Sequence, residues 1–131
     1  MYLFGIIMVT YVEHLKNILN HIVDSYHILE AIDDKPGDLI KIEKEMLKIN
    51  GFIKVVSNKI DPDKIPLSDF KIVKSKFSEY LTNYSFEKEI ETMAPLYSND
   101  VSRIKNMRIK ILEALKNKNM MDDVKELLND L

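Results

Sequence analysis

The chain contains no cysteine and no tryptophan, and only three glycines and four prolines among its 131 residues. Without cysteine there is no disulfide and no thiolate ligand, which is the composition expected in a reducing compartment such as the cytoplasm. So few glycines exclude the glycine-rich loops that cradle phosphate groups in the common nucleotide pockets. They also disfavour an all-β fold, which needs many tight turns.

Neither a long apolar run nor an excess of positive charge is present. The longest uncharged stretch is residues 1–12, whereas spanning a bilayer takes about 20 apolar residues. A secretory signal would need basic residues ahead of that stretch. We therefore expect neither a transmembrane segment nor a signal peptide. The net charge of -2 at pH 7 also excludes a generally basic nucleic-acid-binding protein.

Two long segments carry apolar residues at alternating spacings of three and four, which is typical of helices that bury one face. The first runs from about 9 to 32, and Thr10 and Glu13 match a capping box that would start it. The second runs from 38 to 60 and keeps its phase through the dipeptide Asn50-Gly51, so we expect one continuous helix there. The connection between the two segments is short, which predicts antiparallel packing. The two stripes consist of Met8, Val12, Leu15, Leu19, Ile22, Tyr26 and Leu29, and of Leu39, Ile42, Met46, Ile49, Ile53, Val56 and Ile60.

The rest of the chain repeats the helical pattern in shorter pieces. Ile40 and Leu47 add a second apolar line to the helix at 38–60, which we interpret as contact with neighbours on two sides. No stretch alternates as a strand would. The sequence therefore predicts an all-α fold: residues 1–131 form a single helical bundle of about four to six helices with two long antiparallel N-terminal helices. The remaining expected elements are an apolar arm at 1–8, a proline-containing linker at 61–67, a helix capped by Ser68, a short acidic helix at 86–94, a helix at about 100–117 and a last short helix.

The residue types that usually carry catalysis or bind metals are scattered. His14, His21 and His27 share one helix but lack the i,i+4 spacing of a zinc helix. Glu87 and Glu91 are interpreted as a solvated acidic face. We therefore assign no catalytic residue, no metal ligand and no cofactor. One alternative stays open, a small all-α enzyme or ligand-binding protein whose pocket uses Tyr80, Tyr84 and Tyr97.

The apolar arm at 1–8 is the first candidate surface for a partner. Its candidate residues are Leu3, Phe4, Ile6 and Ile7. An uncharged apolar stretch of this length is expected to be covered, either as an arm or helix extension docked on the chain's own bundle or by a partner. A translation start at Met8 is a third alternative, which would leave the arm out of the protein.

The second candidate surface is basic. Residues 101–119 hold six basic residues against one acidic residue, with Arg103, Lys105, Arg108 and Lys110 as the candidate partner-binding residues. The simplest interpretation of these basic residues is an ordinary mixed-charge surface, in which the basic helix packs between acidic neighbouring segments. The stretch has few arginines and no aromatic residue, so specific readout of nucleic acid is not favoured. Arg108 falls on the apolar side of its helix, so we expect it to reach the edge or to pair with a carboxylate of another helix. A subunit contact is its alternative.

These patterns together favour a non-enzymatic helical protein–protein interaction or assembly module, with a homo-oligomer as one form of it. The expected partner is the chain itself or another protein. The alternative is an accessory protein that contacts nucleic acid or an acidic partner through the basic helix at 101–118.

Overall fold

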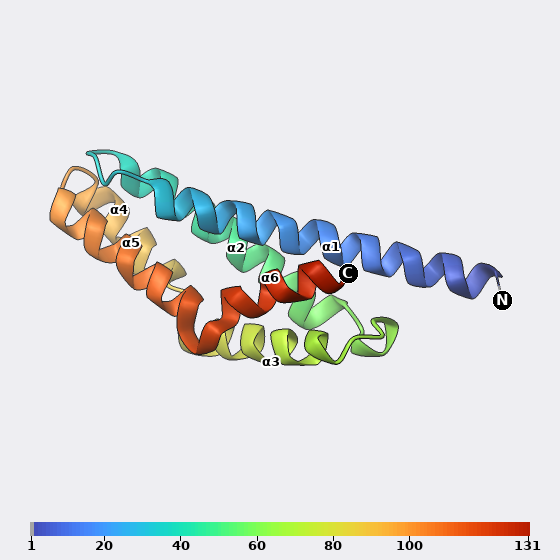
Figure 1. The fold of residues 1–131 in the computed structure, drawn as a ribbon. Helices are drawn as coiled ribbons and strands as arrows, with labels where there is room; N and C mark the ends of the chain where they lie inside the picture. Colours follow the sequence, from blue (N-terminus) through green and yellow to red (C-terminus); the bar gives the residue numbers. More distant parts are fainter. Residues whose placement is uncertain (1) are drawn as a thin grey trace.

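Six α-helices and two short 3₁₀-helices make up most of residues 2–131, whose backbone this computed structural model describes (Figure 1). Side chains are described from Thr10 onward. No strand occurs in residues 2–131, so the predicted all-α fold is confirmed. The elements are α1 (Tyr2–Ala31), α2 (Asp38–Lys59), η1 (Pro62–Lys64), α3 (Ser68–Asn83), α4 (Glu87–Tyr97), α5 (Val101–Lys116), η2 (Asn117–Asn119) and α6 (Met120–Asp130).

The two long N-terminal helices pack against each other as predicted, and α2 runs back along α1 (Figure 1). Leu19 of α1 and Ile53 of α2 are completely buried in the shared core. The turn between the helices needs Gly37, whose φ of +88° is a conformation that favours glycine. The Gly37 N–H donates a hydrogen bond to the Ser98 carbonyl at 2.8 Å. This bond ties the α1–α2 connection to the end of α4.

Helix α2 is continuous through Asn50-Gly51, and so the prediction from the unbroken phase is confirmed. Gly51 is exposed, and a Cβ added there would meet no atom within 4 Å. The glycine therefore serves no close approach of a neighbour. Its residue type is simply unfavourable in the middle of a helix.

Replacing Gly51 with alanine should raise the free energy of unfolding by up to about 1 kcal/mol, because alanine is the better helix former and restricts the unfolded chain. Urea denaturation measures this as a higher midpoint at an unchanged slope. A lower midpoint would contradict the open surroundings of Gly51.

The predicted start of the first helix is wrong. Helix α1 begins at Tyr2 rather than near residue 9, so Thr10 and Glu13 lie inside it and do not start it. Residues 2–9 contain no proline, and one glycine costs a helix only about 1 kcal/mol. A capping motif starts a helix only where the preceding chain leaves the helical conformation. The expected arm is therefore helical from Tyr2, and Met1 lies outside the described residues.

Three smaller expectations about the other helices are also corrected. Helix α4 continues past Pro95 to Tyr97, because a proline removes one backbone hydrogen bond without always ending a helix. Ser68 is the first residue of α3 and its side chain makes no capping hydrogen bond. Helix α2 does contact α1, α3, α4 and α5, but Ile40 and Leu47 are 64% and 45% exposed. The second apolar line of α2 therefore faces solvent.

Candidate functional site

The first turns of α1 extend beyond every other helix of the bundle (Figure 1). Along α1, Thr10 is exposed, Tyr11 and Val12 are partly buried against the core, and Leu15 is completely buried. Among the side chains that the structure describes, Tyr11 is therefore the first one that packs against the bundle. The side chains of Leu3, Phe4, Ile6 and Ile7, the candidate residues of the arm, lie outside the described ones.

The basic charges of α5 and its C-terminal turn are mostly paired within the chain. Arg103 lies 3.3 Å from the Asp100 carboxylate and its guanidinium stacks on the Tyr97 ring. Lys110 lies 2.9 Å from Glu89 of α4. Further pairs join Arg108 to Asp34, Lys116 to Glu30 and Lys118 to Glu79. Lys105 alone of the six basic residues has no ion pair with the described part of the chain. Carboxylates of neighbouring helices and loops therefore neutralise most of this positive charge.

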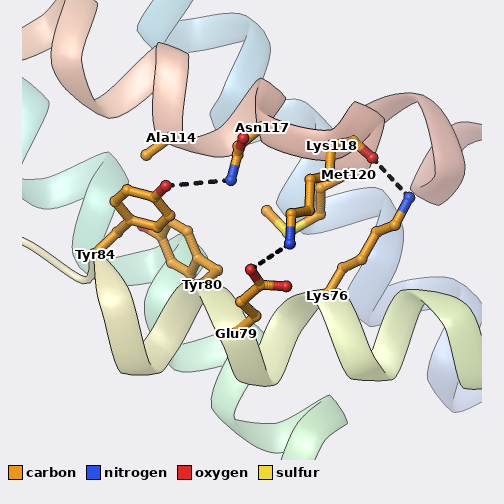
Figure 2. Close-up of a pocket in the computed structure, with 8 residues that line it drawn as sticks. All are labelled: Lys76, Glu79, Tyr80, Tyr84, Ala114, Asn117, Lys118 and Met120. Atoms are coloured by element: carbon orange, nitrogen blue, oxygen red, sulfur yellow. Dashed lines mark hydrogen bonds and ion pairs between the residues drawn. The ribbon is translucent and has the colours of Figure 1, made fainter.

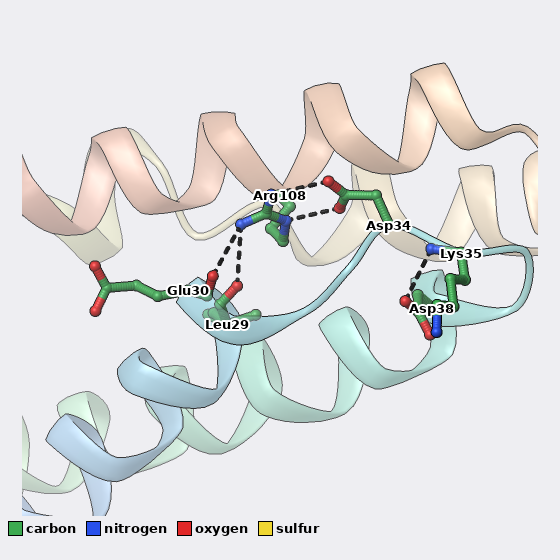
Figure 3. Close-up of polar contacts among 6 residues, drawn as sticks. All are labelled: Leu29, Glu30, Asp34, Lys35, Asp38 and Arg108. Atoms are coloured by element: carbon green, nitrogen blue, oxygen red, sulfur yellow. Dashed lines mark hydrogen bonds and ion pairs between the residues drawn. The ribbon is translucent and has the colours of Figure 1, made fainter.

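Arg108 of α5 binds the connection between α1 and α2 (Figure 3). Its Nε and Nη2 donate to the two oxygens of Asp34 at 2.7 and 2.8 Å, a bidentate pair. Its Nη1 donates to the main-chain carbonyls of Leu29 and Glu30 at 3.3 and 3.4 Å. These carbonyls belong to the last turn of α1, where no further turn of helix can satisfy them. One guanidinium thus caps a helix and holds the loop that follows it.

The Arg108–Asp34 pair lies mostly out of solvent, with side-chain exposures of 14% and 9%. The hydrogen bonds that Arg108 makes to Asp34 raise the pKa of the guanidinium above its ordinary value. The expected internal carboxylate partner is therefore found, although Asp34 lies in a loop rather than on another helix. Nε, Nη1 and Nη2 of Arg108 all donate hydrogen bonds within the chain. Arg108 therefore acts as a structural tie between α5 and the α1–α2 connection.

Of the three tyrosines considered for a ligand pocket, only Tyr80 and Tyr84 lie together. Tyr80 and Tyr84 line a hollow between α3 and the α5–α6 junction (Figure 2), where Asn117 donates to the Tyr84 hydroxyl at 3.2 Å. The hollow has room for about one water molecule. Tyr97 lies elsewhere, at the end of α4 beneath Arg103. These positions give no support to a ligand pocket built from the three tyrosines.

A polar network that the sequence did not reveal lies in the core between α2, α3 and the start of α4. Asn50 is completely buried and accepts a hydrogen bond from the Tyr80 hydroxyl at 2.7 Å. Its amide nitrogen donates to the Ser85 carbonyl at 2.8 Å and to Glu87 at 3.3 Å. Burial, and then the charge of Glu87, raise the pKa of Tyr80. The sequence feature that could have indicated this network is Tyr80, which lies within the apolar stripe of α3, because a buried hydroxyl needs a hydrogen-bond partner.

In the described part of the chain, no three histidines or acidic residues are placed to hold a metal ion. His21 stacks on Phe52, and His27 lies 3.0 Å from Glu30. The pKa of Asp69 is raised because its carboxyl shares a hydrogen bond with Asp130. Among the described residues, no helix is both long enough and apolar enough to cross a membrane.

The chain matches no protein-family model, no curated protein and no solved structure. The helix extension of α1 and the paired basic surface of α5 are the two features of the chain that bear on function.

Proposed function

We propose that the protein is a non-enzymatic helical protein–protein interaction module whose contact surface is the N-terminal segment of α1, residues 2–12. The observation that carries the proposal is that α1 remains helical from Tyr2 and extends beyond the rest of the bundle (Figure 1). This segment contains no charged residue. A helix that is uncharged and mostly apolar around its circumference is stable in water only when other groups cover it. Self-association is the form of assembly that needs no further component.

The alternative, contact with nucleic acid through the basic helix at 101–118, has less support. Phosphate binding depends on basic side chains that are free to replace counterions. Five of the six basic residues in this stretch already pair with carboxylates of the same chain. A salt-dependent mobility shift with single- or double-stranded nucleic acid, abolished by replacing Lys105 and Lys110 with serine, would favour this alternative over the proposal.

Deleting residues 1–7 should lower the oligomeric state while leaving the helix content of the bundle nearly unchanged. Burying apolar side chains of this kind contributes about 1.5–3 kcal/mol each, enough to hold copies together once association entropy is offset. Light scattering and circular dichroism measure the two quantities.

A matched control removes apolar surface from another exposed place. Replacing Ile40 and Leu47 with serine takes two exposed apolar side chains from α2 and should leave the oligomeric state unchanged. A protein that is monomeric both before and after the deletion contradicts the proposal. Loss of folding on deletion also contradicts it, because the segment would then belong to the core.

A further inference from the structure

The apolar stripe that α1 turns toward the bundle is longer than the bundle. Leu15, Ile18 and Ile22 mark this face with buried side chains, and Tyr11 is partly buried against the same core. Counting back along α1 in steps of three and four reaches further positions on the same face. Three of these positions carry large apolar residues: Met8, Ile7 and Phe4. The face that packs the core therefore continues beyond the point where the core ends.

The chain cannot cover this continuation by folding back, because α1 is one uninterrupted helix from Tyr2 to Ala31. Figure 1 shows no other helix of the same copy beside its first turns. A helix-on-helix contact with a second copy supplies a matching stripe of the same length. Both segments lack charge over residues 2–12, so such a contact desolvates no ion.

Steric clashes between the two bundles decide whether the two α1 segments run parallel or antiparallel. The bundle lies on the same side of α1 as the stripe, since Leu15 and Leu19 are buried in it. Two parallel segments joined stripe to stripe would bring both bundles into the same space. Antiparallel segments place the two bundles at opposite ends, where the projecting turns shown in Figure 1 leave room for both. A two-fold axis then relates the copies, which is the commonest symmetry of soluble dimers.

We infer that the partner is a second copy of this chain, bound through an antiparallel contact between the two α1 segments that is centred between positions 7 and 8. This inference rests on the proposed function. Position 4 of one copy then faces position 11 of the other, and position 7 faces position 8. An aromatic residue such as Phe4 buries about 150–250 Å², whereas Tyr11, already partly buried against its own core, adds less. With positions 7 and 8 included, the contact buries about 1,000 Å² in total, as in weak and reversible dimers.

Disulfide cross-linking tests the direction of the contact cleanly because the chain has no cysteine of its own. The variants are Phe4→Cys and Tyr11→Cys, oxidised separately and as an equimolar mixture. In the antiparallel dimer, like positions lie about 10 Å apart along the axis, too far for a disulfide. We expect the mixture to form the cross-linked heterodimer in several-fold higher yield than either variant alone forms a homodimer. Intact mass spectrometry separates the three products, since the two variants differ in mass.

A charge exchange provides a second readout that does not depend on cross-linking. Ile7→Glu and Met8→Lys should each be monomeric alone, because each buries an unpaired charge. Mixed together they should form a dimer by analytical ultracentrifugation, because the glutamate of one copy faces the lysine of the other.

The control for the disulfide cross-linking is Ile28→Cys, at an exposed position near the other end of α1, which should give no cross-link.

The outcomes separate this inference from the function on which it rests. Efficient cross-linking of each cysteine variant with itself, and none in the mixed pair, would show parallel segments and overturn the inference while the proposed function stands. Failure of the mixed charge variants to dimerise would overturn it in the same way. A wild-type chain that stays monomeric at high concentration would overturn both.

Discussion

Replacing Arg108 with methionine should lower the free energy of unfolding by about 2–4 kcal/mol. Removing one member of a largely buried ion pair typically costs about 3–5 kcal/mol, because it leaves an uncompensated charge behind. Here the pair keeps some contact with solvent, which reduces the loss. The substitution leaves Asp34 without its bidentate partner and uncaps the carbonyls of Leu29 and Glu30. Chemical denaturation monitored by circular dichroism measures the change.

Arg103→Met is the matched control for this experiment. Arg103 lies on the same helix and also pairs with an aspartate, but its side chain is 52% exposed. Exposed pairs of this kind contribute about 1 kcal/mol or less. The double variant that adds Asp34→Asn to Arg108→Met should recover part of the loss, because the charge left unpaired is then removed. Equal effects of Arg108→Met and Arg103→Met would contradict the structural tie.

Replacing Leu19 or Ile53 with alanine should each destabilise the protein by about 2–5 kcal/mol. Both side chains are completely buried where α1 and α2 pack. Truncation removes their transfer free energy from water and leaves a cavity that the surrounding helices fill only partly. Thermal or urea denaturation measures the loss, and both variants should retain the helical spectrum at low denaturant.

The controls use the same residue changes, or nearly so, on the outer faces of the same helices. Ile28→Ala on α1 and Ile40→Ala on α2 remove side chains that are 47% and 64% exposed, so each should change stability by no more than about 0.5 kcal/mol. Near-native stability of both Leu19→Ala and Ile53→Ala would contradict the packing of the two stripes.

The helices themselves could be predicted from the sequence because their signal is periodic and local. The unbroken phase of the apolar stripe correctly predicted that α2 continues through Gly51, although the dipeptide Asn50-Gly51 by itself favours a turn. Boundaries failed where one short motif was given too much weight. Thr10 and Glu13 matched a capping box, yet the helix continues ahead of them. The exposure of Ile40 could not be predicted either, since an apolar residue beside a stripe is buried only if another helix reaches it.

The polar partners were beyond sequence reasoning for a different reason. The unusual position of Arg108 indicated that it needed a carboxylate, but the chain offers 21 acidic residues. The one that it binds, Asp34, is 74 residues away. Only the packing of α5 against the end of α1 brings the two together. The same holds for Asn50 and Tyr80, which are 30 residues apart and meet only when α2 and α3 are in register.

The buried Asn50 network also bears on how many ways the helices can pack. The stripe of α2 is built of similar aliphatic residues at repeating intervals, so sliding α2 by a heptad along its neighbours would again bring apolar residues against apolar residues. The same slide would separate the Asn50 amide from the Tyr80 hydroxyl and the Ser85 carbonyl that it now joins. Those groups would then be buried and unpaired, at a cost that apolar contacts elsewhere do not offset. The network thereby widens the energy gap between the native arrangement and its slipped competitors, and gives a repetitive core a single ground state.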